Sequence, residues 1–152
     1  MHSKRLWQAA SQIGTPPVYI TAIVITAAFS LQVAAWAAIS VIAVEIAGAL
    51  IKLAYPTERP KARKRQSILQ KIDSGSFPSI HTARVSAFAA TISLATVSNM
   101  AIAASALLIT AVGVSRIRLR HHYLLDVLGG GILGVFMAVI VFIAKNGIRG
   151  LH

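Results

Sequence analysis

The chain of 152 residues contains no cysteine, and only 12% of its residues are charged. The absence of cysteine excludes a disulfide framework, thiolate catalysis and any cysteine-ligated zinc site. An ordinary soluble domain is about 25% charged and about 45 to 50% apolar. Because 56% of this chain is hydrophobic, a water-soluble monomer is effectively ruled out.

Acidic residues are scarce as well: four Asp and Glu stand against fifteen Lys and Arg, which gives a formal net charge of +11. A charge inside a bilayer is costly and is usually retained for a function, so every charge near an apolar segment needs an explanation. The positive charge sits in loops at the edges of apolar segments. This distribution follows membrane topology and argues against a nucleic acid partner.

Three apolar runs dominate the sequence. Residues 18–51 carry Glu45 as their single charge, residues 82–114 carry only Arg84, and residues 123–144 have the length of one helix. A straight helix through the first run would be about 51 Å long, whereas the hydrocarbon core of a bilayer is about 30 Å thick. Each of the first two runs should therefore contain two helices.

The sequence thus predicts a single all-α domain over residues 1–152, an integral membrane bundle of about five transmembrane helices with a polar loop after the second. The expected spans are roughly 16–30, 32–55, 82–98, 100–115 and 123–144, with turns near Ser30 and Ser98. The glycines from Gly129 to Gly131 and Gly134 lie inside the last span, where small residues permit close helix packing.

The N-terminal segment admits several interpretations. Residues 1–15 are typical of an interfacial lead-in with Trp7 at headgroup depth, or of a frayed tail. A signal peptide competes, since Lys4 and Arg5 precede an apolar run and residues 35–37 resemble a cleavage site, but the run continues beyond that site. Inside the runs, Glu45 is expected in a structural ion pair or hydrogen bond rather than in catalysis. Arg84 is expected to snorkel, or else to contact a second phosphate or a headgroup.

Polar residues form three islands at the edges of the apolar runs: 52–60, 77–81 and 115–126. Five spans would bring all three islands to one side of the membrane. Lys52, Arg59 and Arg116 would then gather around one point, which like charges resist unless an anion of high charge density lies at the centre. Phosphate fits this description, and the planar fork of an arginine can hold two of its oxygens.

His122 and Asp126 are four residues apart, so they should share one face of the fifth helix near its start. The carboxylate could accept one imidazole N–H and leave the other ring nitrogen free as a nucleophile or base. A helix-start aspartate beside an interfacial histidine explains this pair equally well on its own. His81, before a span, favours the catalytic interpretation only together with the other islands.

The residues in these islands resemble the three-part signature of the type 2 phosphatidic acid phosphatase superfamily. The matching parts are Lys52-x6-Arg59-Pro60, Pro78-Ser79-Ile80-His81 and Ser115-Arg116-x5-His122-x3-Asp126. The resemblance covers residues 52–126 and keeps the order of the three parts. The sequence departs from the family pattern at Ile80, where the family has glycine.

The resemblance implies a membrane lipid phosphatase that works in two steps without a metal or another cofactor. His122, oriented by Asp126, would form a phosphohistidine, and His81 would protonate the leaving group. Phosphate oxygens would be held by Lys52, Arg59, Arg116, Ser79 and the backbone at Ile80. The substrate would be a phosphomonoester or diphosphate of a phosphatidyl-type or isoprenyl lipid.

Two alternatives stay open. A β-branched residue at position 80 would be strained if the site demands positive φ, which would leave a catalytically weak lipid-phosphate binder. A small anion transporter would also need clustered cations, but not the paired histidines. Neither the length nor the glycine run indicates an oligomeric state.

The distribution of cations outside the site predicts on which side of the membrane the polar islands lie. Two lie beyond the fifth span, Lys145 and Arg149, whereas nine lie on the side of the polar islands: Lys4, Arg5, Lys61, Arg63, Lys64, Arg65, Lys71, Arg118 and Arg120. The positive-inside rule therefore predicts an active site on the cytoplasmic side of the cell membrane. The cluster from Lys61 to Arg65 is expected to touch anionic headgroups.

Overall fold

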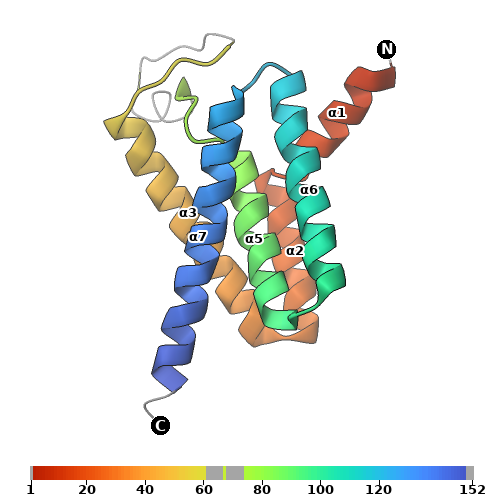
Figure 1. The fold of residues 1–152 in the computed structure, drawn as a ribbon, viewed down its shortest axis with the longest axis vertical. Coiled ribbons are helices and arrows are strands. Elements are labelled where there is room, and N and C mark those ends of the chain that lie inside the picture. The colour runs from red at the N-terminus through yellow and green to blue at the C-terminus, as the bar shows by residue number, and fades with distance from the viewer. Residues whose placement is uncertain (1, 61–66, 68–73, 150–152) are drawn as a thin grey trace.

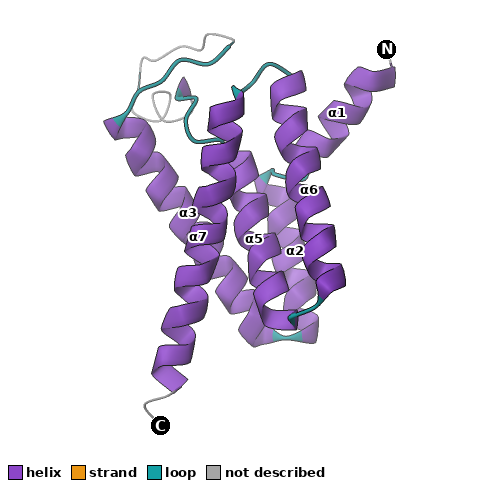
Figure 2. Cartoon of the chain, viewed as in Figure 1, coloured by secondary structure: helices purple, strands orange, loops and turns teal. Residues whose placement is uncertain are grey.

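The computed structural model describes residues 2–60, 67 and 74–149 (Figure 1). All the regular structure within these residues is helical (Figure 2). The helices are α1 (His2–Gln12), α2 (Pro16–Phe29), α3 (Leu31–Ala54), α5 (Ile80–Thr96), α6 (Asn99–Arg118) and α7 (Leu124–Arg149). The basic cluster from Lys61 to Arg65 lies outside the described residues. The bundle agrees with the all-α membrane fold expected from the sequence.

Serine side chains begin the helices that follow the two tight turns inside the long apolar runs. Ser30 separates α2 from α3, and its hydroxyl accepts a hydrogen bond from the backbone N–H of Val33 at 3.3 Å. Ser98 likewise caps α6 by accepting from the N–H of Ala101 at 3.4 Å. Because a serine N-cap satisfies an otherwise unpaired N–H, these turns need neither glycine nor proline.

The central helix is α5, which packs against α3, α6 and, most extensively, α7. Its contact with α3 includes the buried core residues Val41 and Val44 on one side and Ala83 and Ala87 on the other. These small and β-branched side chains allow the helices to approach closely. Much of the larger apolar surface is left on the outside of the bundle.

The glycines of α7 permit its contact with α5 and the preceding loop. A Cβ atom added at Gly130 would lie 2.4 Å from the backbone oxygen of Ser79, and one added at Gly134 would lie 2.2 Å from that of Ala83. Real Cβ atoms do not approach a backbone oxygen so closely. The close packing expected from the glycine run is therefore confirmed.

Large apolar side chains on the outward faces suit a lipid environment. Among the described residues, α3, α6 and residues 124–147 of α7 are each long and apolar enough to cross a membrane. The helices α1 and α2, which meet at a 51° bend, would make a fourth span if counted as one. With 14 and 17 residues, α2 and α5 are shorter, about 21 and 26 Å long.

The two lone charges of the first two apolar runs meet inside the bundle. Nη2 of Arg84 donates to Oε2 of Glu45 at 3.0 Å, and its Nε donates to the other carboxylate oxygen. The structural ion pair expected for Glu45 is confirmed. The snorkelling expected for Arg84 is wrong, because the adjacent packing of α3 and α5 brings its guanidinium to this carboxylate, where each charge compensates the other.

One end of the bundle collects the end of α3, the start of α5, the end of α6 and the start of α7 (Figure 1). The start of α1 lies at this end, and the end of α7 lies at the opposite one. On α7, Lys145 places its ammonium 3.5 Å from the centre of the Trp36 ring of α3. The polar islands of the sequence therefore lie at the same end of the fold.

Candidate active site

Asp126 joins three segments at this end of the bundle. It lies in the first turn of α7, where its Oδ2 accepts the backbone N–H of Tyr123 at 2.7 Å and the hydroxyl hydrogen bond of Ser76. A carboxylate that reaches back to the residue before a helix caps its N-terminus. The backbone oxygen of Asp126 also accepts the N–H of Ser79 at 2.8 Å. The loop before α5 is thus fixed to the start of α7.

His122 lies in the turn before α7 and not on the helix, so the expectation that it shares a helical face with Asp126 is wrong. The backbone N–H groups of His121 and His122 both point to the oxygen of Arg116, at 3.0 and 3.3 Å, and Arg120 has a φ of 55°. This tight turn delays the start of α7 to Leu124.

The turn nevertheless brings the two side chains together. Nδ1 of His122 lies 3.6 Å from Oδ2 of Asp126, longer than a hydrogen bond but close enough for an ion pair once the imidazole carries a positive charge. Both residues are buried, with 2% and 5% of their surface exposed. Catalytic hydrogen bonds are often long in an empty site and shorten when substrate binds.

Lys52 and Arg59 converge on the loop before α5. Nζ of Lys52 donates to the backbone oxygen of Gly75 at 3.0 Å, and Nε of Arg59 donates to the same oxygen at 3.3 Å. Lys52 is 4% exposed, so its charge is held within the protein. Its place in the last turn of α3 also complements the negative end of the helix dipole.

Arg116 supplies the third cation from the last turn of α6. It is 5% exposed, and its Nη1 donates to the hydroxyl of Ser11 at 2.6 Å. Two residues further along, the guanidinium of Arg118 lies 5.9 Å from the centre of the Trp7 ring. The end of α6 is therefore in contact with α1.

The electrostatic environment of His81 and His122 shows that the three islands meet. In the first turn of α5, outside the candidate spans, His81 has its pKa lowered from 6.5 to about 3. The causes are burial first, then the charges of Arg116, Arg84, Arg59 and His121. The pKa of His122 is lowered as well, by burial and then by Arg59, Arg116 and Lys52. Both imidazoles are therefore neutral near pH 7 and lie in the field of the same two arginines.

Ser79 and Ile80, expected from the sequence to hold phosphate oxygens, lie at the start of α5, and this role stays a prediction. Ser79 is fully buried, its N–H is taken by Asp126, and its hydroxyl accepts a hydrogen bond from Thr82 at 3.0 Å. Ile80 begins α5 and packs on α3, where a Cβ added at Gly48 would lie 2.1 Å from its Cδ1.

The backbone at Ile80 is unstrained. Among the described residues, positive φ occurs outside glycine only at Val97 and Arg120. The strain that motivated the weak-binder alternative is therefore absent, because position 80 takes the ordinary backbone of a helix start. The side chain instead fills space beside Gly48.

Several residues of the site were missed by the sequence analysis. Gly75 provides the oxygen shared by the two cations, and Ser76 bonds to Asp126. The hydroxyl of Thr57 accepts the N–H groups of Ser76 and Phe77, at 3.1 and 2.8 Å. The small polar run from Ser74 to Ser76, directly before the second island, was the available signal. Ser11 gave no signal, because its partner lies 105 residues away.

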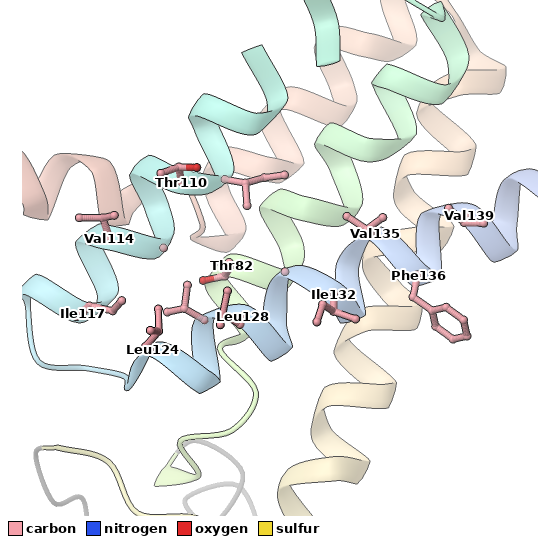
Figure 3. A pocket seen from close by; sticks show the side chains of 14 residues that line it. Thr82, Thr110, Val114, Ile117, Leu124, Leu128, Ile132, Val135, Phe136 and Val139 are labelled. Carbon is pink, nitrogen blue, oxygen red and sulfur yellow. The ribbon is translucent and has the colours of Figure 1, made fainter. Parts of the chain in front are cut away.

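An apolar groove of about 690 Å³ runs between α6 and α7 and ends beside this site (Figure 3). Thr82 of α5, the neighbour of His81, lies between the two helices, whose side chains form the walls. Ile117 and Leu124, which flank the His122 turn, lie at one end of the groove, and Val139 lines it further along α7. Apart from Thr82 and Thr110, the lining residues are apolar or glycine.

The arrangement suits an oxyanion. The N-termini of α5 and α7 bring the positive ends of two helix dipoles to the region of Lys52, Arg59 and Arg116, and such ends favour anions. Two neutral imidazoles in the same field could serve as a nucleophile and a proton carrier. Within the described part of the chain, no three His, Asp or Glu side chains gather as ligands for a metal ion.

Comparisons with known proteins agree with this fold. The family model of the PAP2 superfamily matches residues 33–149. The crystal structure of LpxE from Aquifex aeolicus superposes with a TM-score of 0.79 at 19% sequence identity, covering 91% of this chain and 84% of that one.

A second similar structure is that of a transmembrane PAP2 type phosphatidylglycerolphosphate phosphatase from Bacillus subtilis. Its TM-score is 0.77 at 20% identity, and the alignment covers 95% of this chain and 77% of that one. At these identities the likeness concerns the fold. A search of curated protein sequences finds no match.

Proposed function

The chain belongs to the PAP2 superfamily, and on this premise we propose that it is a membrane-embedded lipid phosphatase that uses no metal. The observation that carries the proposal is the position of half-buried His81 and buried His122 in the field of Arg59 and Arg116, at the end of an apolar groove. Fixed positive charge stabilises the equatorial oxygens of a transferring phosphoryl group. The two neutral imidazoles can act as nucleophile and proton carrier, which the lysine and arginine cations cannot do.

In the first step, His122 attacks phosphorus and forms a phosphohistidine while the bond from phosphorus to the leaving oxygen breaks. His81 donates a proton to that oxygen. In the second step, water attacks phosphorus, His81 takes up the water proton, and the bond between phosphorus and His122 breaks to release inorganic phosphate. Asp126 offsets the positive charge that develops on the His122 imidazole.

The charged state of His81 is coupled to substrate binding in this proposal. Burial and the surrounding cations hold its pKa near 3, so the empty site contains a poor acid. A bound phosphate dianion would neutralise those cations and favour the protonated imidazole. Substrate therefore helps to create the acid that its own hydrolysis requires.

The groove between α6 and α7 supports a lipid as the carrier of the phosphate. From Leu124 to Val139 it follows fifteen steps of helix, about 22 Å. This length suits a long acyl or isoprenyl chain, whose phosphate would then lie beside His122. The substrate class is a phosphomonoester or diphosphate of a phosphatidyl-type or isoprenyl lipid.

The test is release of inorganic phosphate by the detergent-purified protein from a panel of these lipids, in the presence of EDTA. We expect release by the wild type and a loss of about 1,000-fold or more in His122→Ala. His121→Ala, the adjacent histidine, is the matched control and should keep most of the activity. Binding of the lipids without release would instead indicate a binder, and anion flux across liposomes without hydrolysis a transporter.

The groove has a separate test with two variants of α7. Ile132 lines the groove and is 71% exposed, whereas Ile143 is 63% exposed and does not line it. Ile132→Trp should raise KM for long-chain substrates about tenfold, because lost apolar contact costs about 0.8 kcal/mol per methylene. Ile143→Trp should not, and neither variant should alter hydrolysis of a short water-soluble phosphate ester. Equal effects of both tryptophans would rule out the groove as the chain site.

The cytoplasmic orientation is also part of the proposal. The start of α1 lies at the end of the bundle that holds His122, and the end of α7 lies at the other. A tag after the C-terminus should therefore be accessible from outside intact cells, and a tag before the N-terminus should not. The reverse pattern would place the site on the outer face.

A further inference from the structure

The first 32 residues lie outside the segment matched by the family model, yet α1 contacts the candidate site. It packs beside the end of α6, with Ser11 bonded to Arg116 and Trp7 beside Arg118. The contact therefore connects a segment outside the family match to an arginine of the phosphate site. No residue of α1 belongs to the three-part signature.

Ser11 is placed to orient Arg116. The residue is 7% exposed, and its hydroxyl accepts a hydrogen bond from Nη1 of the guanidinium at 2.6 Å, a short distance for a bond between nitrogen and oxygen. Hydrogen bonds with a charged partner are shorter and stronger than neutral ones. A guanidinium has five N–H donors in one plane, so a bond at Nη1 fixes the plane while other donors can face a phosphate.

The turn after α1 is fixed against the other side of the site. A Cβ atom added at Gly14 would lie 2.9 Å from the backbone oxygen of His81, so the two backbones are in direct contact. The backbone oxygen of Gly14 also accepts a hydrogen bond from Nη1 of Arg84 at 3.2 Å. The same guanidinium forms the ion pair with Glu45. The helix that carries Ser11 is therefore followed by a turn that contacts His81, the proposed acid.

We propose that Ser11 is a positioning residue of the phosphate site, which fixes the guanidinium of Arg116 so that its remaining donors face the phosphate between His81 and His122. This inference rests on the phosphatase function proposed above. Its new content is that α1, outside the matched segment, completes the anion site. Ser11 acts through Arg116 and does not itself react.

The test compares three variants of Ser11 in the full-length protein. Ser11→Ala removes the acceptor, Ser11→Cys replaces it by a weak one at similar size, and Ser11→Thr retains a hydroxyl. Binding of inorganic phosphate is measured by calorimetry, and kcat and KM are measured with a lipid phosphate. Ser40→Ala is the matched control, because Ser40 is fully buried and its hydroxyl accepts from Thr91 at 3.2 Å, away from the site.

We expect Ser11→Ala and Ser11→Cys to weaken phosphate binding about tenfold and to raise KM similarly, as expected for a hydrogen bond to a charged group. Ser11→Thr should stay within about twofold of the wild type, and Ser40→Ala should bind phosphate normally even if it melts earlier.

Equal phosphate binding by the wild type and both Ser11→Ala and Ser11→Cys would overturn the positioning role while leaving the phosphatase function intact. A loss that Ser40→Ala reproduces would reduce Ser11 to a structural hydroxyl, which also overturns it. A wild type that neither binds phosphate nor releases it from any lipid would overturn both proposals together.

Discussion

Oδ2 of Asp126 lies 3.6 Å from Nδ1 of His122, and the same oxygen accepts the backbone N–H of Tyr123 at 2.7 Å. One carboxylate oxygen thus caps α7 and faces the proposed nucleophile. The two roles differ in what they require, since capping needs an acceptor whereas stabilising a positive imidazole needs a negative charge. A substitution that keeps the acceptor can separate them.

Asp126→Asn is that substitution. The amide oxygen can still accept from Tyr123, so we expect a melting temperature close to that of the wild type. The negative charge that would offset the positive His122 imidazole in the proposed phosphohistidine step is lost, so kcat should fall about 100-fold or more. Phosphate release and thermal melting measured on one preparation check both statements. An unchanged kcat would show that Asp126 only caps the helix.

The lowered pKa values predict acid sensitivity of the fold. An unfolded histidine binds a proton near pH 6.5, whereas His81 in the folded protein does so only near pH 3. Between these values the unfolded state binds more protons, so the free energy of unfolding falls as the pH drops from about 6.5 toward 3. The melting temperature should therefore fall between pH 7 and pH 4.5.

His81→Gln should reduce that fall, because the variant has one fewer histidine that is protonated only on unfolding. For each protein, the melting temperature at pH 4.5 is subtracted from that at pH 7. A change in stability that is the same at both pH values then cancels. A wild type and a variant with the same decline would contradict the assigned environment of His81.

Ile80→Gly should weaken the protein and should not improve it. Ile80 fills the space above Gly48 with ordinary helical backbone, so the variant leaves a void and adds a flexible residue to the first turn of α5. We expect a loss of about 1–3 kcal/mol in the free energy of unfolding, measured by denaturation. A large gain in phosphate release would instead favour the alternative in which Ile80 leaves a catalytically weak lipid-phosphate binder.

Gly130→Ala should damage both stability and activity, since its Cβ would lie 2.4 Å from the backbone oxygen of Ser79. Ser79, together with the start of α5 that carries His81, would have to move. Gly147 on the same helix is the matched control, because nothing lies within 4 Å of a Cβ added there. Gly147→Ala should be neutral or stabilise by about 0.5–1 kcal/mol, as alanine is the better helix former. Equal losses in both variants would contradict the proposed contact.

Much of the fold follows from bulk properties of the sequence. Run lengths against the thickness of a bilayer predict where helices must divide, and the breaks at Ser30 and Ser98 lie where the expected turns lie. The convergence of Lys52, Arg59 and Arg116 follows from counting how often the chain returns to one side. These inferences need only helix length and charge repulsion.

The finer geometry depends on contacts that spacing does not encode. The i, i+4 rule placed His122 on a helix, but it assumes continuous helix, and the backbone bonds to Arg116 end α6 in a turn first. The strain considered at Ile80 depended on its backbone φ, which the sequence does not encode. In the structure the side chain packs on Gly48 and the backbone is that of an ordinary helix start. The role of Ser11 could not be predicted from the sequence, because it depends on a hydrogen bond to Arg116, which is 105 residues away.

The attachment of the loop before α5 to Asp126 has a consequence for biosynthesis. Ser76 and Ser79 both bond to a residue that is translated about fifty positions later, on the last long helix. The earlier helices can enter the bilayer in order, but the loop has no anchor at this residue until α7 follows. Catalytic competence should therefore appear only at the end of membrane insertion, and a nascent chain that stops before α7 would be inert.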